Sequence, residues 1–380
     1  MKIPLFKIFW DKEDIKMVNE LIKKGAYWAG GLTIDKFEEK IAKYIGRKYC
    51  VVFNSGTSAL HAILLAYGIK PDDEVIVPSF TFIATANAPL FVGAKPVFAD
   101  IEEETFGLSP KSVKEKITSK TKAIIPIHYS GCPCLIKELR KIANDYNLIL
   151  IEDAAEAFGA RIKNKKVGTF GNSAMLSFCQ NKIITTGDGG AIVTDSRNIY
   201  EEMKLIRSHG RQEDSNYIGT PEYLDYIKLG YNFRMPDMVA ALGISQIKKV
   251  EKLIEMRRKN AEYLTKKLKK IDGIILQNPP NDYFHVYQMY TIRIKKGIKV
   301  RNSLIKNLAE NGIMTKVYFN PIHLTRFYKR EFGHKKNELP ITEKISEQVL
   351  TLPLFPTLTK KEIDYIVRTI GVFFKNQDVK

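Results

Sequence analysis

The chain has 380 residues, 44% of them hydrophobic, which is enough to bury the cores of about two domains. No run approaches the roughly 18 apolar residues of a membrane helix, and Met1 is not followed by a long apolar signal region, so we expect a cytoplasmic protein without a membrane partner. The net charge of +18 comes from dispersed lysines and suits an anionic small substrate rather than a nucleic acid, and the four cysteines lack the spacing of a metal site.

The apolar pattern predicts alternating helices and strands over the first half of the chain. Two helices are predicted first, at residues 11–24 and 33–45. Seven apolar runs then predict strands, at residues 49–53, 74–77, 95–98, 123–127, 148–151, 173–177 and 191–194. Helical patterns separate the earlier strands, so we expect an α/β fold with a seven-stranded, mostly parallel sheet and helices on both faces. The site of such a fold lies at the carboxyl ends of its strands.

The second half of the chain has a different pattern. One long helix is expected from residue 237 to about residue 270, where its length suggests a bridge between domains. A strand pattern at residues 287–293 and a helix pattern at residues 300–311 then indicate a small α+β domain. We therefore predict a large cofactor-binding domain of residues 1–245 and a small C-terminal domain of residues 246–380.

One lysine stands out because of its position. Lys182 follows the strand at 173–177 and precedes a glycine cluster and the strand at 191–194, so it lies in a loop at a strand end. Partial desolvation there lowers the pKa of a lysine and frees its amine for Schiff-base chemistry. Upstream, the strand at 148–151 ends in carboxylates that include Asp153. Pyridoxal phosphate requires this pair, a lysine for its aldehyde and a carboxylate that keeps its pyridine nitrogen protonated.

At these residues the sequence resembles the fold-type-I pyridoxal-phosphate enzymes, and within them the DegT-type nucleotide-sugar aminotransferases. The resemblance covers nearly the whole chain. Five motifs carry it in the order that the family has, at residues 54–59, 78–82, 152–156, 177–190 and 230–235.

The resemblance implies which residues bind the cofactor. Gly56 and Thr57, at a turn into a helix, are expected to hold its phosphate together with the hydroxyl of Ser177; an ordinary helix cap is the alternative. Phe82 is expected to stack on the pyridine ring, and a core phenylalanine is the alternative. Glu156 is expected near the cofactor hydroxyl.

Other residues are implied for the subunit contact and the substrate. Asn232 is expected to reach the cofactor phosphate of a neighbouring subunit, which implies a homodimer with shared active sites. Tyr318 and His323 are expected to lie against the sugar nucleotide, with a structural role as the alternative for His323. His128, at the end of the strand at 123–127, is a further possible site residue, although a lone histidine is more often structural.

The implied function is a transaminase that moves an amino group, with glutamate as the expected donor, to a nucleotide-linked keto sugar. Lys182 would move the proton at the substrate carbon, and Asp153 would keep the pyridine nitrogen protonated so that the ring can accept electrons. The motifs around both residues are most similar to perosamine synthases, which aminate C4 of 4-keto-6-deoxy sugars. The alternatives are a sugar dehydratase of the same fold, whose relatives have histidine at the position of Lys182, and a cofactor-binding regulator or basic nucleic-acid-binding protein, which would leave both residues without a use.

Overall fold

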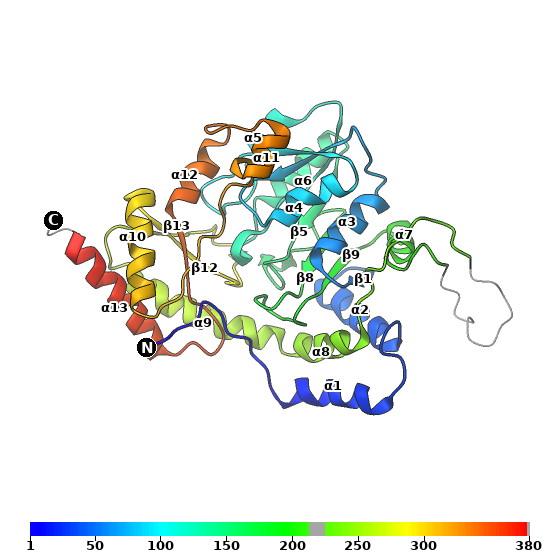
Figure 1. Cartoon of the computed structure of the whole chain (residues 1–380), viewed down its shortest axis with the longest axis horizontal. Helices are drawn as coiled ribbons and strands as arrows, with labels where there is room; N and C mark the ends of the chain where they lie inside the picture. The colour runs from blue at the N-terminus through cyan, green and yellow to red at the C-terminus, as the bar shows by residue number, and fades with distance from the viewer. Residues whose placement is uncertain (213–224, 378–380) are drawn as a thin grey trace.

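The computed structural model describes residues 1–212 and 225–377. Its largest element is a seven-stranded sheet in the order β1-β9-β8-β5-β4-β2-β3 (Figure 1). Within this sheet only β9 runs against its neighbours. The seven predicted strands are confirmed, as β1 (Tyr49–Phe53), β2 (Glu74–Pro78), β3 (Lys95–Ala99), β4 (Thr121–Ile124), β5 (Ile149–Asp153), β8 (Ser173–Ser177) and β9 (Gly190–Thr194).

Helices cover both faces of this sheet because successive side chains of each strand point to opposite sides. Val51 and Phe53 of β1 belong to one core cluster, whereas Cys50 and Val52 belong to another. The first cluster is closed by α3 (Gly56–Ala66), α4 (Ile83–Phe91) and α7 (Arg197–Arg207). The opposite face is closed by α2 (Leu32–Ile45), α5 (Pro110–Lys116), α6 (Ile136–Asp145) and α8 (Asp237–Lys248).

A second, smaller sheet forms in the C-terminal part and has a core of its own. It is antiparallel, in the order β10 (Ile274–Leu276), β12 (Tyr290–Ile294), β13 (Val349–Leu352). Its core also includes Ile3 from the start of the chain, and the helices around it are α9 (Val250–Leu268), α10 (Gly297–Glu310) and α13 (Lys360–Gln377). The division of the chain at residue 245 stays a prediction.

Short elements complete the fold. A third sheet joins β11 (Tyr283–Phe284), β6 (Arg161–Ile162) and β7 (Lys165–Lys166). Two short helices, α11 (Arg326–Phe332) and α12 (Pro340–Gln348), lie in Figure 1 between the small sheet and the upper side of the large one. Across the described ranges, no helix is both long enough and apolar enough to cross a membrane.

The single helix expected from residue 237 to about residue 270 is wrong, because the structure has two helices there. α8 ends at Lys248 and α9 begins at Val250, and Lys249 between them has φ −109° and ψ 7°. The ammonium of Lys249 lies 2.7 Å from Asp11 and 2.9 Å from Asp14, at the start of α1 (Lys12–Lys24). The break is therefore associated with a tertiary contact, which the apolar periodicity of the sequence does not reveal.

Candidate active site

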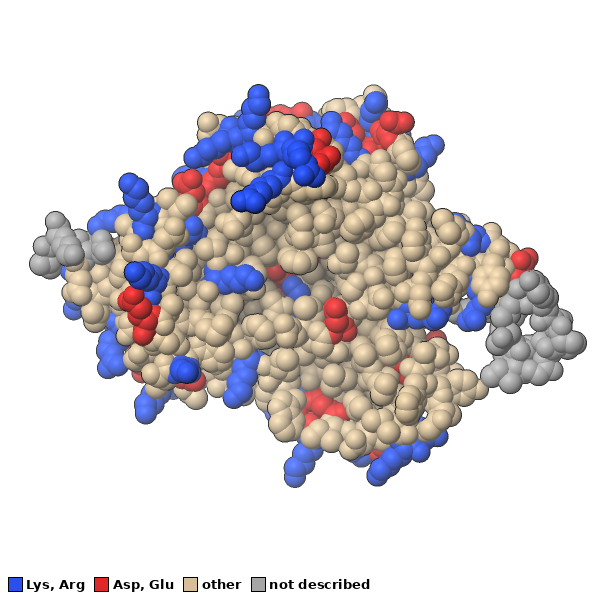
Figure 2. Space-filling model, viewed as in Figure 1, with Lys and Arg blue, Asp and Glu red and all other residues tan. Residues whose placement is uncertain are grey.

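The candidate site lies at the edge of the large sheet where β5 and β8 end. Asp153 is the last residue of β5 and Ser177 the last residue of β8, and these strands are neighbours. Since β9 is antiparallel, its first residue, Gly190, lies at the same edge and pairs with both Ser177 and Phe53. Figure 2 shows a hollow in the middle of this face of the molecule, with basic and acidic groups inside it.

Lys182 and Glu156 form a buried pair beside this edge. The Nζ atom of Lys182 lies 3.7 Å from Oε1 of Glu156, and their side chains are only 12% and 4% exposed. The other carboxylate oxygen of Glu156 accepts a hydrogen bond of 2.8 Å from the backbone N–H of Ser130. Burial raises the pKa of Glu156, and the positive charge of Lys182 opposes that rise. The ion pair with Glu156 thus holds the side chain of Lys182 in a mostly buried position.

Asp153 is buried close to the same lysine. One oxygen accepts a hydrogen bond of 2.7 Å from the hydroxyl of Thr85, and the other accepts one of 3.1 Å from the N–H of Ala155. Burial raises the pKa of Asp153, while the Thr85 hydrogen bond and the charge of Lys182 oppose the rise. Thr85 was not predicted from the sequence, although its position three residues after Phe82, in the segment that leaves the carboxyl end of β2, is a signal that could have indicated it.

The turn expected to bind phosphate packs directly on the strand ends. Helix α3 begins at Gly56, and the hydroxyl of Ser55 caps it by accepting the N–H of Ser58 at 3.1 Å. A Cβ atom on Gly56 would lie 3.5 Å from Cβ of Ser177, and one on Gly190 would lie 2.5 Å from the Gly56 nitrogen. The structure therefore brings Gly56, and with it Thr57 in the first turn of α3, beside Ser177. The first N–H groups of a helix are suited to an anion at this place.

Phe82 and Asn232 are exposed. Phe82 immediately precedes α4 and is 58% exposed, although it is a large apolar side chain. Asn232 is an exposed residue, and its side-chain amide forms no hydrogen bond with any other described residue. The next residue, Phe233, accepts the N–H of Asn54 at 2.8 Å, so this segment runs beside the turn that precedes α3.

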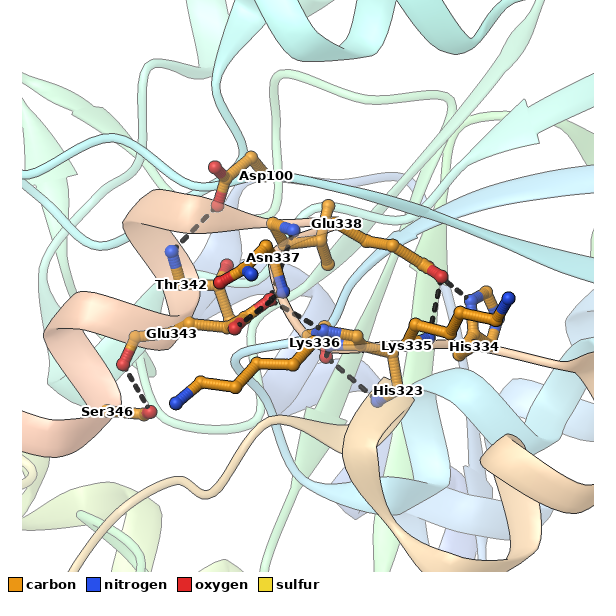
Figure 3. Close-up of polar contacts among 12 residues, drawn as sticks. Asp100, His323, His334, Lys335, Lys336, Asn337, Glu338, Thr342, Glu343 and Ser346 are labelled. Carbon is orange, nitrogen blue, oxygen red and sulfur yellow. Dashed lines mark hydrogen bonds and ion pairs between the residues drawn. The ribbon is translucent and has the colours of Figure 1, made fainter.

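His323 is fully buried and lies between the end of β2 and α12 (Figure 3). Its Nδ1 lies 2.7 Å from the hydroxyl of Ser79, just after β2, and its Nε2 lies 3.3 Å from Glu343 of α12. Burial lowers the pKa of His323, opposed by the hydrogen bond to Glu343. Both ring nitrogens are thus occupied by protein groups. Direct contact between His323 and a substrate stays a prediction, and this arrangement leaves the ring no free nitrogen for it.

Tyr318 is closer to the lysine loop. It is half-buried and lines a small cavity together with Asn181, Gln288 and Met289. Its backbone carbonyl accepts the hydroxyl of Tyr129.

The possible site role of His128 is not supported, because the structure gives this residue a structural one. His128 is fully buried, its Nδ1 accepts the N–H of Cys134 at 3.1 Å, and its Nε2 lies 3.1 Å from Glu152. Glu152 also accepts three backbone N–H groups, at 2.7 to 2.8 Å. Burial acts to raise the pKa of Glu152, but the hydrogen bonds from His128 and the backbone outweigh it and lower that pKa. Through these hydrogen bonds His128 and Glu152 hold together the chain segments that surround β5.

The sequence of this chain matches a known family along almost its entire length. The profile of the DegT/DnrJ/EryC1/StrS aminotransferase family matches residues 9–371. The chain belongs to this family. It is 35% identical to the GDP-perosamine synthase of Escherichia coli O157:H7, over 99% of both chains.

Solved structures agree with this assignment. The fold is similar to that of the Helicobacter pylori aminotransferase PseC, which is involved in the biosynthesis of pseudoaminic acid, with a TM-score of 0.93, 28% identity, and coverage of 99% of this chain and 100% of that one. The PMP form of the Streptococcus pneumoniae protein Spr1654 has the same TM-score, 26% identity and the same coverage. This chain is therefore a pyridoxal-phosphate-dependent nucleotide-sugar aminotransferase.

The residues at the sheet edge fit the cofactor of a DegT-family aminotransferase. A lysine and two carboxylates of raised pKa, Asp153 and Glu156, lie together in a desolvated place. At the same edge, the backbones of Gly56 and Gly190 approach each other so closely that a Cβ atom on Gly190 would clash. Because both residues are glycines, the N-terminus of α3 can lie over the strand ends. The amine, the carboxylates and the anion-binding turn that the cofactor needs are all present.

Proposed function

We propose that this aminotransferase moves an amino group from glutamate to the keto carbon of a nucleotide-linked 4-keto-6-deoxy sugar. The observation that carries the proposal is the position of Lys182, desolvated and 3.7 Å from Glu156, at the strand edge that also holds Asp153. The likeness to GDP-perosamine synthase over 99% of both chains supports the sugar class.

Two residues carry the chemistry in this proposal. When bound, pyridoxal phosphate supplies an aldehyde that links to amines and a ring that accepts electrons. The amine of Lys182 would bind the cofactor through its aldehyde and, when free, would move the proton at the substrate carbon. Asp153 keeps a proton on the ring nitrogen, and Thr85 keeps the Asp153 carboxylate oriented.

The other predicted residues bind the cofactor and the sugar nucleotide. The first turn of α3, with Gly56 and Thr57, and the hydroxyl of Ser177 hold the phosphate. Phe82 would stack on the ring, and the exposure of its phenyl side chain just before α4 supports this role. Glu156 holds the amine of Lys182 and lies near the cofactor hydroxyl.

Tyr318 lies against the sugar nucleotide in this proposal. Since His323 is buried and both its ring nitrogens are occupied, it acts indirectly, by fastening the segment of residues 318–323 to Ser79. Asn232 reaches the phosphate of a second subunit, so the enzyme is a homodimer with shared sites. The exposure of the Asn232 amide, which leaves it free for such a contact, supports this assignment.

The variant Lys182→Ala tests the role of the lysine. We expect it to lose the visible absorption of the covalently linked cofactor and at least about a hundredfold in turnover, because both need the amine. Lys166→Ala is the matched control, since Lys166 is another partly buried lysine, its pKa is lowered by burial, and it contacts Tyr44 away from the strand edge. Unchanged absorption in Lys182→Ala would contradict the assignment.

The sugar class is tested separately. Purified enzyme is incubated with glutamate and keto sugars linked to GDP, UDP or TDP, and the products are identified by mass spectrometry and NMR. We expect an amine at C4 of a 6-deoxy sugar. A product aminated only at C3 would contradict the proposed substrate and leave the role of Lys182 intact.

A further inference from the structure

The peptide bond that leads into Lys182 is held at both ends. The N–H of Lys182 donates to the carbonyl of Cys179 at 3.0 Å, which closes a turn. The carbonyl of Asn181, in the same peptide unit, accepts a hydrogen bond of 2.9 Å from the side-chain amide of Gln288. Because a peptide unit is planar, holding its N–H and its C=O fixes the plane that carries the Cα atom of Lys182, which limits the directions open to its side chain.

Gln288 is itself firmly placed. It lies in the segment just before β12 and is 4% exposed. Its backbone carbonyl accepts a hydrogen bond of 3.3 Å from the guanidinium of Arg257, on α9. On the other side the backbone of Gly131 packs closely, since a Cβ atom there would lie 3.0 Å from the Gln288 nitrogen. The side-chain amide of Gln288 therefore reaches Asn181 from a buried backbone that is contacted on two sides.

The same segment also reaches the other end of Lys182. The N–H of Met289 donates to the carbonyl of Ser130 at 3.2 Å, and the hydroxyl of Ser130 donates to the carbonyl of Met289 at 2.9 Å. The N–H of Ser130 in turn donates to Glu156, the partner of the Lys182 ammonium. Residues 288 and 289 thus act on the backbone of Lys182 directly and on its amine through two further residues.

We propose that Gln288 is a positioning residue that aims the amine of Lys182 at the cofactor. This inference rests on the proposed role of Lys182. The orientation of the Gln288 amide follows from chemistry, since only its NH₂ group can face the Asn181 carbonyl. Its Oε1 is buried without a hydrogen-bond partner among the described residues, which is unfavourable on its own.

The variant Gln288→Leu tests the proposal, because leucine keeps most of the volume, removes the unpaired oxygen and deletes the hydrogen bond. The measurement is the affinity of the cofactor-free protein for two probes. Pyridoxal phosphate links covalently to Lys182, whereas pyridoxamine phosphate cannot. We expect about tenfold weaker and slower linkage of pyridoxal phosphate, read from its visible absorption and by borohydride trapping, and affinity for pyridoxamine phosphate within about twofold.

Gln246→Leu is the matched control. Gln246 is also a buried glutamine, but the hydrogen bonds of its amide go to the carbonyl of Phe9 at 3.2 Å and to Asp14 at 3.1 Å. We expect it to leave the linkage unchanged. Equal weakening for both probes in Gln288→Leu, or unchanged linkage, would overturn the inference. Covalent linkage that persists in Lys182→Ala would instead overturn the proposed function, so the two failures are distinguishable.

Discussion

Three carboxylates within five residues have different roles because their surroundings differ. Glu152 is surrounded by donors, one histidine and three backbone N–H groups, and its pKa is lowered. Asp153 and Glu156 have fewer donors and share the charge of one lysine, so burial raises the pKa of each. Groups with raised pKa values beside a lysine are typical of a reaction centre, whereas the fully bonded Glu152 is typical of structure.

Thr85 is the hydroxyl donor to Asp153, so Thr85→Val should disturb that carboxylate. Losing the hydrogen bond raises the pKa of Asp153 further, so we expect turnover to fall about tenfold and the acid limb of the kcat/KM profile to move to higher pH. Thr81→Val is the control, because the Thr81 hydroxyl contacts Thr85 but not Asp153. A profile in Thr85→Val identical to that of the wild type would show that Asp153 does not depend on this donor.

His285 predicts a pH dependence of stability. Burial, aided by the charge of Arg258, lowers the pKa of His285 to about 3. Since the unfolded side chain titrates near 6.5, its neutral form stabilises the fold fully above that pH, and the contribution is lost as pH falls towards 3, by about 1.4 kcal/mol per pH unit. We expect His285→Gln to have a shallower loss of the free energy of unfolding between pH 6 and pH 4, measured by urea denaturation. Parallel curves for the two proteins would contradict this.

Among the elements, the start of α12 is joined to the end of β3 in the large sheet. The carboxylate of Asp100, just after β3, accepts the N–H of Ile341 at 2.9 Å and that of Thr342 at 2.8 Å, in the first turn of α12 (Figure 3). A carboxylate is favourable there, because it satisfies free N–H groups and interacts well with the helix dipole. The loop before α12 is held by Glu343, which accepts the N–H of Asn337 at 2.8 Å.

The variant Asp100→Ala should therefore destabilise the docking of α12. We expect a loss of about 1–2 kcal/mol in the free energy of unfolding, as for the removal of a helix cap, measured by chemical denaturation. Asp100→Asn keeps one acceptor oxygen and should lose less. Equal losses in the two variants would show that the negative charge, and not the hydrogen bonding, stabilises the helix.

At the scale of the whole molecule, large apolar side chains are exposed on one group of elements. Four of them are between 50% and 75% exposed: Trp10 just before α1, Tyr27 and Trp28 between α1 and α2, and Leu32 at the start of α2. Exposed apolar side chains that are gathered in one region are typical of surfaces that bind another protein, a ligand or a membrane. This surface supports the proposed homodimer.

A mixed dimer tests whether the subunits share their sites. A Lys182→Ala chain paired with an Asn232→Ala chain has one site with both defects and one with neither, if Asn232 acts across the interface. Losing a hydrogen bond to a charged phosphate costs about 1.5–3 kcal/mol, which weakens cofactor binding about 10- to 150-fold. Co-expression should therefore restore tight binding and turnover at one site of each dimer. If mixed dimers form and no activity returns, Asn232 acts within its own chain.

Much of this protein follows from local sequence patterns. Alternating and continuous apolar runs predicted all seven strands of the large sheet, because the apolar pattern of a strand depends on residues that are adjacent in the sequence. The positions of Asp153 and Ser177 at strand ends followed from the same runs, and the loop position of Lys182 from its flanking strand and glycines. The family motifs then indicated the cofactor. These features depend on residues that are close in sequence.

The tertiary structure decided what depends on residues far apart in the chain. Asp153 meets Thr85 across 68 positions, and Asn181 meets Gln288 across 107. The break at Lys249 accompanies its contacts with Asp11 and Asp14, more than 230 positions away. A sequence pattern records whether a side chain is apolar and where it repeats, but hydrogen bonds between distant segments form only when packing brings the donors and acceptors together.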